Sequence, residues 1–332
     1  MALSATPAAL ESVTLPNGWS HNVCRVVEKL PKNGVDEALD HIERWARVFP
    51  HKGTWIGDTF GVPSLAVRIE GTYDEENGWK IFEIEDRPCG LGVTPRINDA
   101  FAQRFAALLP RWPLMKWVID PERNTDDDLW LGPGITVEEA LKRDGLLLVR
   151  SRPEKTAYHE LESRSVSTIS REGDKRCLAE LGLGTIVRWE PDDEELEGKL
   201  TPAVTNASVI KPVQGTRCRN VMVYLNGAVT YKKLAGQKTP FIGDRRLHKS
   251  KSDTVTFERL LKEVRSMGEA ICQPFHMPME LDHLPNMNAI YRFYFGFDPG
   301  TQRYVPLGGV YNASTSLRVH GEEGVVFGPL DF

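Results

Sequence analysis

The sequence is short of cysteine and of long hydrophobic runs. Its five cysteines are scattered, odd in number and never arranged as C-x-x-C, which indicates reduced thiols rather than a disulfide framework. No apolar run approaches the roughly 18 residues of a membrane-spanning helix, and the first residues lack the basic and apolar regions of a signal peptide. We therefore expect a cytoplasmic protein with no membrane partner.

An excess of positive charge is also missing. The 332 residues include 41 lysines and arginines against 46 aspartates and glutamates, a net charge of −5. Such a composition does not indicate a nucleic-acid partner. Hydrophobic residues make up 41% of the chain, enough to bury sizeable cores, and the length predicts about two domains.

Several common site motifs are absent. The sequence contains no Walker A loop, no GxGxxG, no GxSxG elbow and no HExxH. An acidic stretch from Asp120 has Thr125 where a calcium loop needs glycine and Leu131 in place of the closing glutamate. The eight histidines show no ligand spacing. A P-loop enzyme, a serine hydrolase of the elbow type and a zinc protease are therefore not indicated.

Periodic patterns predict a chain that mixes helices and strands, an α/β (α+β) fold. Residues 35–49 place hydrophobic side chains at helical spacing. Residues 64–85 predict a β-hairpin around the turn DEENG. Asn98 is expected to cap a helix over residues 101–109.

The rest of the chain alternates in the same way. Strands are predicted at residues 113–119 and 145–149, on either side of a helix opened by the capping box Thr136 to Glu139. A further helix is predicted at 253–267. Strands are also expected at 207–213, 219–226 and 269–275, and in a long hairpin over 289–311.

Three carboxylates gather in the first predicted hairpin. Glu83 and Glu85 are two residues apart on one arm and Glu70 lies on the other, so side-chain alternation places all three on one face. Like charges at this spacing repel unless a positive group lies between them. Such oxygen-rich side chains suit Mg²⁺, which also bridges phosphates. The alternative interpretation is a hairpin with acidic surface residues.

The spacing in this hairpin resembles the metal-binding end of the ATP-grasp ligases. That family has Arg-x-Asp, a hairpin, and then Glu-x-Asn-x-x-Pro-Gly; here the order is Arg68-x-Glu70, Glu83-x-Glu85 and Pro88-Cys-Gly90. The chain departs from the family pattern at Glu70, at Glu85 and at the inserted cysteine. The resemblance implies ATP as the nucleotide and Mg²⁺, as two ions, held by Glu70, Glu83 and Glu85.

Four further elements resemble the nucleotide site of the same family, and they follow in the same order. They are D-K at 174–175 before a helix, a strand-K-P-loop-strand unit at 209–224, Q-P-F at 273–275, and an arginine within a strand. Each has a local alternative, such as a helix cap or a strand end, and their order favours the resemblance. The residues that it assigns to ATP are Lys175, Lys211, Gly215, Arg217, Arg219, Gln273, Phe275 and Arg292.

The carboxylate hairpin comes first in this chain, whereas it comes last in the common ATP-grasp arrangement. This order resembles the circularly permuted type, which includes eukaryotic glutathione synthetase and the glutathionylspermidine synthetase group. The resemblance implies two α+β lobes that clasp ATP, together with an α/β pre-ATP-grasp segment. We expect the metal hairpin within residues 1–110, the pre-ATP-grasp segment at 111–155 and the nucleotide-binding lobes at 156–332.

For such a protein the resemblance implies an ADP-forming carboxylate–amine ligase that makes an amide bond through an acyl phosphate. Arg68 is expected to meet the oxyanion of the tetrahedral intermediate, and Arg87 to hold the substrate carboxylate by a bidentate contact. The partners would be a small carboxylic acid and an amine, such as an amino acid, a peptide or a polyamine; an oligomer is compatible with the sequence. Two alternatives stay open: a small-molecule kinase on the same fold, and a non-catalytic nucleotide-binding module.

Overall fold

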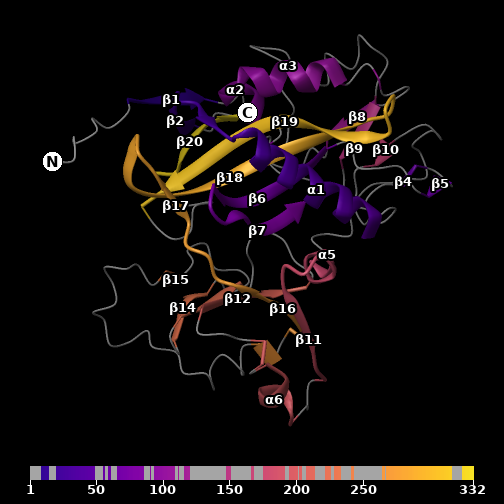
Figure 1. Ribbon diagram of the computed structural model, residues 1–332, viewed down its shortest axis with the longest axis vertical. Coiled ribbons are helices and arrows are strands. Elements are labelled where there is room, and N and C mark those ends of the chain that lie inside the picture. Colours follow the sequence, from indigo (N-terminus) through magenta and orange to yellow (C-terminus); the bar gives the residue numbers. More distant parts are fainter. Residues whose placement is uncertain are drawn as a thin grey trace. The chain divides into compact units, whose positions relative to one another are not determined.

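The computed structural model has mixed α/β architecture, with large sheets and few helices in the part of the chain that it describes (Figure 1). The described residues are 9–14, 20–48, 55–56, 59–60, 66–85, 90, 93–108, 111, 116–119, 147–150, 166–167, 175–190, 194–200, 202–203, 207–213, 221–225, 228–232, 241–242, 264–265, 267–315 and 324–332. The chain divides into two compact units. Unit 1 contains residues 1–171, 278–315 and 319–332, and unit 2 contains residues 172–277 and 316–318.

The main sheet of unit 1 has nine strands among the described residues. Seven follow the order β1-β2-β20-β19-β18-β6-β7, while β17 pairs with β18 and β3 with β20. The strands are β1 (Leu10–Thr14), β2 (Ser20–Cys24), β3 (Glu28–Lys29), β6 (Ala66–Asp74), β7 (Gly78–Glu85), β17 (Met279–Leu281), β18 (Leu284–Asp298), β19 (Arg303–Ser314) and β20 (Val326–Asp331). Segments from both ends of the chain therefore share one sheet.

Both predicted hairpins are confirmed. Strands β6 and β7 pair antiparallel across a tight turn, and β18 and β19 do the same around the DPGT turn. The structure adds the pairing between them, since β18 runs antiparallel to β6. This long-range pairing brings the two hairpins side by side.

Helices cover the two faces of this sheet. The predicted first helix is present as α1 (Lys32–Val48), and its Trp45 ring packs edge-on against Tyr304. The short helix α2 (Thr94–Ile97) leads into α3 (Asp99–Leu108), whose Phe101 ring packs against Tyr294. Because side chains alternate along a strand, the register of β18 and β19 places Tyr304 and Tyr294 on opposite faces.

The predicted helix cap at Asn98 is also confirmed. Its side-chain oxygen accepts a hydrogen bond from the Phe101 N–H at 3.0 Å, which satisfies a donor in the first turn of α3. The amide nitrogen of the same side chain donates to the carbonyls of Gly309 and Leu330 at 2.8 and 2.9 Å. One buried side chain thus starts the helix and fastens it to β19 and β20.

A second sheet of unit 1 has the order β5-β4-β10-β9-β8. The predicted strands of the α/β stretch are present in it as β8 and β9, which pair in parallel. The helix predicted between them lies outside the described residues. The strands are β4 (Trp55–Ile56), β5 (Thr59–Phe60), β8 (Lys116–Ile119), β9 (Leu147–Arg150) and β10 (Val166–Ser167).

Unit 2 contains a sheet of six described strands in the order β11-β16-β12-β13-β14-β15. The predicted strands at 207–213, 219–226 and 269–275 are confirmed as β12, β13 and β16, whereas most of the helix predicted at 253–267 lies outside the described residues. The elements are α5 (Arg176–Glu180), β11 (Thr185–Arg188), α6 (Leu196–Leu200), β12 (Ala207–Pro212), β13 (Met222–Leu225), β14 (Ala228–Lys232), β15 (Phe241–Ile242) and β16 (Glu269–Pro274). Trp189, Leu196, Ile210 and Met222 are among the residues of its core.

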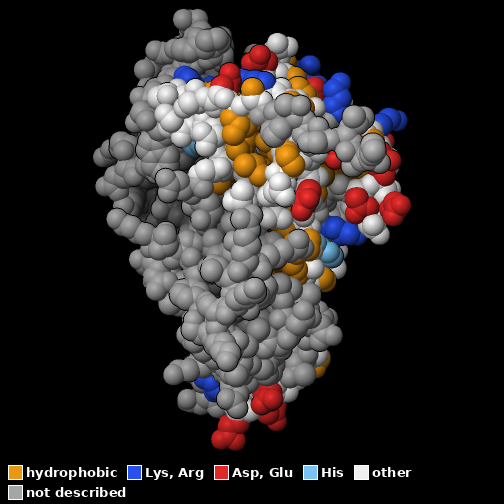
Figure 2. Space-filling view, turned by 90° about the vertical axis from the view of Figure 1, so that its left-hand side faces the viewer, with side chains coloured by type: hydrophobic (Ala, Val, Ile, Leu, Met, Phe, Trp, Pro, Cys, Tyr) orange, Lys and Arg blue, Asp and Glu red, His pale blue; other side chains and the backbone are white. Residues whose placement is uncertain are grey.

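The described surface is mixed in charge. Figure 2 shows acidic and basic side chains next to one another, as 41 basic and 46 acidic residues in one chain would give. None of the helices in the described ranges is long and apolar enough to cross a membrane.

Candidate functional site

The first hairpin places four charged side chains on one face of the main sheet. In the β6–β7 register Arg68 lies opposite Glu85 and Glu70 lies opposite Glu83. Cross-strand partners share a face, as do residues two apart on one strand. The register therefore confirms that the three carboxylates face the same side, together with Arg68.

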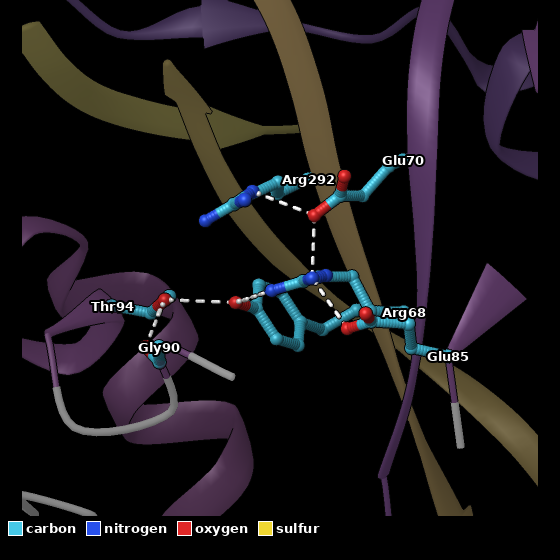
Figure 3. A network of polar contacts seen from close by, with 7 residues as sticks. Arg68, Glu70, Glu85, Gly90, Thr94 and Arg292 are labelled. Atoms are coloured by element: carbon cyan, nitrogen blue, oxygen red, sulfur yellow. Dashed lines mark hydrogen bonds and ion pairs between the residues drawn. The ribbon is translucent and has the colours of Figure 1, made fainter. Parts of the chain in front are cut away.

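Arg68 lies between two of these carboxylates (Figure 3). Its Nη2 is 2.5 Å from Glu70 Oε1 and 2.5 Å from Glu85 Oε2, and its side chain is only 2% exposed. Charge-assisted hydrogen bonds of this length are stronger than neutral ones, and removing one partner of such a buried pair leaves an uncompensated charge. The Arg68 guanidinium thus offsets the repulsion expected between the carboxylates. The sequence did not predict this contact.

Arg292 joins the same cluster from the neighbouring strand. It lies opposite Glu70 in the β18–β6 register, and its Nε is 2.9 Å from Glu70 Oε1. Its side chain is 5% exposed. The strand arginine that the resemblance assigned to phosphate is therefore brought next to one of the predicted metal carboxylates. Glu70 carries two guanidinium contacts on a single oxygen.

Glu85 has a raised pKa. Burial raises the pKa of Glu85 to about 7, the nearby Glu83 and Glu70 add to the increase, and Arg68 opposes it. The side chain is 26% exposed, so water still reaches part of it. Near neutral pH this carboxyl therefore exists in both protonated and ionised forms, a property that is more frequent at functional sites than elsewhere.

Sequence reasoning missed two hydroxyl groups beside this cluster. Tyr294 Oη lies 3.4 Å from Arg68 Nη1 and 3.3 Å from Thr94 Oγ1. Thr94 Oγ1 in turn donates to the Gly90 carbonyl at 2.8 Å. One signal for Tyr294 was available, since it stands two residues after Arg292 on a predicted strand and must share its face. Thr94 carried no comparable signal.

The donor set at the hairpin has the chemistry that Mg²⁺ prefers, namely carboxylate oxygens. A positive group already lies between two of the three carboxylates, because Arg68 Nη2 contacts both Glu70 and Glu85. Across the described ranges, no three His, Cys, Asp or Glu side chains lie close enough together to hold a metal ion. The residues therefore fit a divalent cation in type, and a cation bound by Glu70 and Glu85 would compete with Arg68.

In unit 2 the two predicted phosphate lysines occupy neighbouring elements. Lys175 immediately precedes α5, and its backbone N–H donates to the Val213 carbonyl at 2.9 Å. Lys211 lies on β12, two residues before Val213, and both lysines are almost entirely buried. Since burial of an ammonium group is costly unless a partner offsets it, both positions are more constrained than surface lysines.

The predicted adenine strand is β16, which lies between β11 and β12. Gln273 is opposite Val209 of β12, and its side-chain Nε2 donates to the Leu183 carbonyl at 2.9 Å. Phe275 follows directly after the strand and is partly buried. The remaining predicted site residues, Arg87, Gly215, Arg217 and Arg219, lie outside the described residues.

Comparison with known proteins adds no name to this site. Neither a scan against models of protein families nor a search of curated proteins gave a match. Functional inference therefore depends on the residues of the chain and on their geometry.

Proposed function

We propose that this protein is an ATP-dependent carboxylate–amine ligase of the circularly permuted ATP-grasp type. The observation that carries the proposal is the shared face of Arg68, Glu70, Glu83 and Glu85 on the β6–β7 hairpin, beside Arg292. A surface hairpin with scattered acids would not need two nearly buried arginines directed at the same carboxylate. The resemblance in residue order along the chain gives independent support.

In the proposed reaction the substrate carboxylate attacks the γ-phosphorus of ATP, and the bond from that phosphorus to the bridging oxygen breaks. The products are an acyl phosphate and ADP. An amine then adds to the acyl carbon, the tetrahedral intermediate expels phosphate, and the nitrogen loses a proton to give the amide. Positioning and electrostatic stabilisation account for most of the catalysis in such phosphoryl transfers, so a dedicated nucleophile on the protein is not required.

The residues of this chain have distinct parts in the proposal. Arg68 donates hydrogen bonds to the oxyanion of the tetrahedral intermediate, a task for which a nearly buried guanidinium is suited. Arg292 is proposed to offset charge on a phosphate, and Lys175 and Lys211 have the same proposed role. Arg87 is proposed to hold the substrate carboxylate. Glu70, Glu83 and Glu85 are the proposed carboxylates for Mg²⁺ and would have to come closer together to hold it. When bound, the ion would neutralise charge on the β- and γ-phosphates.

The test is a screen for ADP release. Purified full-length protein would be incubated with ATP and Mg²⁺, across a panel of carboxylic acids, each with and without a pool of amines. Sustained ADP formation is expected only when an acid and an amine are present together, and mass spectrometry should show an amide. A matched reaction with Glu83→Gln protein controls for contaminating ATPases.

The same screen distinguishes the alternative functions. Accumulation of a stable phosphorylated compound, independent of any amine, would replace the ligase with a small-molecule kinase. Tight ATP binding with no turnover on any substrate would instead favour a nucleotide-binding module.

A further inference from the structure

A short series of polar contacts links Arg68 to the chain segment that follows the hairpin. It runs from Arg68 Nη1 to Tyr294 Oη at 3.4 Å, from Tyr294 Oη to Thr94 Oγ1 at 3.3 Å, and from Thr94 Oγ1 to the Gly90 carbonyl at 2.8 Å (Figure 3). Tyr294 and Thr94 are both buried. The four groups come from β6, β18, α2 and the residue at position 90, so the contacts join distant parts of unit 1.

Counting protons gives these contacts a direction. A guanidinium can only donate, a carbonyl can only accept, and a hydroxyl has a single proton. The Thr94 proton goes to the Gly90 carbonyl, which is its nearest acceptor. The same Thr94 hydroxyl also donates, over the longer distance of 3.3 Å, to Tyr294 Oη, and Tyr294 Oη accepts from Arg68 Nη1 as well. Donors from Arg68 and Thr94 thus meet at one Tyr294 oxygen, and polar contacts linked in this way strengthen one another.

Gly90 fixes the far end of the series. Its φ angle is +85°, a conformation that glycine adopts at little cost and that other residues rarely occupy. Its carbonyl accepts both the backbone N–H and the hydroxyl of Thr94, at 3.0 and 2.8 Å. The acceptor is therefore held at the start of α2 and does not depend on a flexible side chain.

At its other end, the series contacts a different nitrogen of Arg68 from the one that contacts the carboxylates. Nη2 contacts Glu70 and Glu85, while Nη1 contacts Tyr294. The Arg68 guanidinium carbon also lies 5.7 Å from the centre of the Tyr294 ring. With both nitrogens engaged, rotation of the guanidinium about its Nε–Cζ bond is hindered.

We propose that Tyr294 and Thr94 are positioning residues that set the orientation of the Arg68 guanidinium. The oxyanion role of Arg68 belongs to the proposed function, so the catalytic consequence rests on it. A donor that stabilises an oxyanion must point to where charge develops, and a small misplacement is costly in rate. Loss of the Tyr294 hydroxyl removes its contact with Nη1, loss of the Thr94 hydroxyl removes a donor that holds Tyr294 Oη, and both changes leave the carboxylate contacts of Nη2 in place.

The first test measures Arg68 directly and needs no substrate. Full-length protein labelled with ¹⁵N-arginine would be studied by NMR, with the Arg68 signal assigned by its loss in Arg68→Lys. Rotation about Nε–Cζ is expected to be slow in the wild type and at least about ten-fold faster in Tyr294→Phe and in Thr94→Val, the scale of one hydrogen bond to a charged group. Thr94→Ser, which keeps the hydroxyl, should match the wild type.

Tyr291→Phe is the matched control, because the Tyr291 hydroxyl forms a hydrogen bond of similar length, which it donates to Glu28 at 3.3 Å. Its side chain points to the other face of β18, so Arg68 rotation should not change. Fast rotation in the wild type, or an unchanged rate in both Tyr294→Phe and Thr94→Val, would overturn the positioning role. The rate of Arg68 rotation in the wild type tests the positioning role even if one variant does not fold.

The second test is a double-mutant cycle on turnover. Tyr294→Phe and Thr94→Val are each expected to lower kcat about ten-fold with KM for ATP unchanged, and the double variant should be no slower than either. Additive losses would show that the two hydroxyls act separately and would overturn the series. Absence of amine-dependent ADP formation in the wild type would remove the proposed function, while the rotation measurement would still decide whether the hydroxyls hold Arg68.

Discussion

The two faces of the β6–β7 hairpin differ in what they bury. The face toward α1 is apolar, with Ile69 and Ile84 paired across the strands and both buried. At its tip, the Trp79 indole N–H donates to the Gly34 carbonyl of α1 at 2.7 Å. The opposite face carries Arg68 and the carboxylates. The same two strands therefore supply part of the core on one side and the candidate site on the other.

The difference between the two faces allows effects on stability and on activity to be separated. Apolar burial on the α1 face stabilises the fold through each methylene removed from water. On the charged face, ion pairs offset one another's desolvation and add little net stability. Truncation of an apolar side chain on the α1 face should therefore lower the free energy of unfolding, whereas replacing a charged-face carboxylate outside the Arg68 ion pairs, such as Glu83, should lower activity.

The largest expected effect is on turnover, from the charged face. Glu83→Gln removes a proposed ligand of Mg²⁺ without changing side-chain volume, so ATP turnover should be abolished. The free energy of unfolding should change by no more than about 0.5 kcal/mol, as for most substitutions outside the core. ADP release at saturating Mg²⁺ and urea denaturation measure the two quantities. An unaltered rate would return the hairpin to the interpretation of acidic surface residues.

Ile69→Ala tests the apolar face and should lower stability rather than activity. Deletion of a fully buried isoleucine typically costs about 2–5 kcal/mol, and Ile69 is completely buried. Urea denaturation is expected to show that loss in the midpoint with an unchanged slope. The residual turnover, measured below the unfolding transition, should stay near that of the wild type. An equal loss of unfolding free energy in Ile69→Ala and Glu83→Gln would contradict the assignment of stability to one face and activity to the other.

Arg68→Ala is expected to slow amide formation by about 10²-fold, the scale of losing one oxyanion donor, with ATP binding nearly unchanged. The reason is that Arg68 contacts carboxylates and, in the proposal, the reacting centre, but not the nucleotide base. Arg104→Ala is a suitable control, because Arg104 also forms an ion pair in unit 1, to Asp331 at 2.6 Å. Steady-state kinetics and calorimetry separate the two effects. A parallel loss of ATP affinity would argue against the oxyanion role.

Substitutions of the two buried lysines in unit 2 test nucleotide binding. Lys175→Met and Lys211→Met should each weaken ATP binding by about ten- to a hundred-fold, since a hydrogen bond to a charged group is worth about 1.5–3 kcal/mol. The exposed Lys199 of α6 provides the control variant Lys199→Met. Wild-type affinity by calorimetry in both buried-lysine variants would exclude this pair from the nucleotide site.

The smallest expected effect is the pH dependence from Glu85. Its folded pKa of about 7 lies above the ordinary value of 4.5, so the folded protein binds this proton more tightly than the unfolded chain does. The corresponding stability is fully present below pH 4.5 and is lost as the pH rises through 7. Glu85→Gln stays neutral throughout. Between pH 4.5 and 8, the unfolding free energy of the Glu85→Gln protein should therefore rise by about 1–2 kcal/mol relative to that of the wild type.

Urea denaturation at several pH values checks this prediction. Glu83→Gln should reduce the pH dependence without abolishing it, because the Glu83 charge adds to the increase in the Glu85 pKa. A difference between the Glu85→Gln protein and the wild type that stays constant with pH would show that Glu85 titrates at the same pH in the folded and unfolded chains.

Sequence alone determined the local features of this protein. Strand-like runs around turn sequences over residues 64–85 and 289–311 were enough to predict two hairpins, and side-chain alternation along a strand was enough to predict the face shared by Glu70, Glu83 and Glu85. The period of a strand is a property of the backbone and needs no information from elsewhere in the chain. The cap at Asn98 was predictable for the same reason, because a cap involves only the first turn of its helix.

Tertiary structure decided which of these local elements meet. Arg68 and Tyr294 are 226 residues apart, and they touch only because β18 pairs with β6 in one particular register. A shift of one residue would turn Arg292 and Tyr294 to the opposite face. That register depends on packing of the whole sheet, including β20, which pairs in parallel with β2 and β3. The sequence therefore contained the charges of the candidate site, and long-range packing determined that arginines lie against the carboxylates.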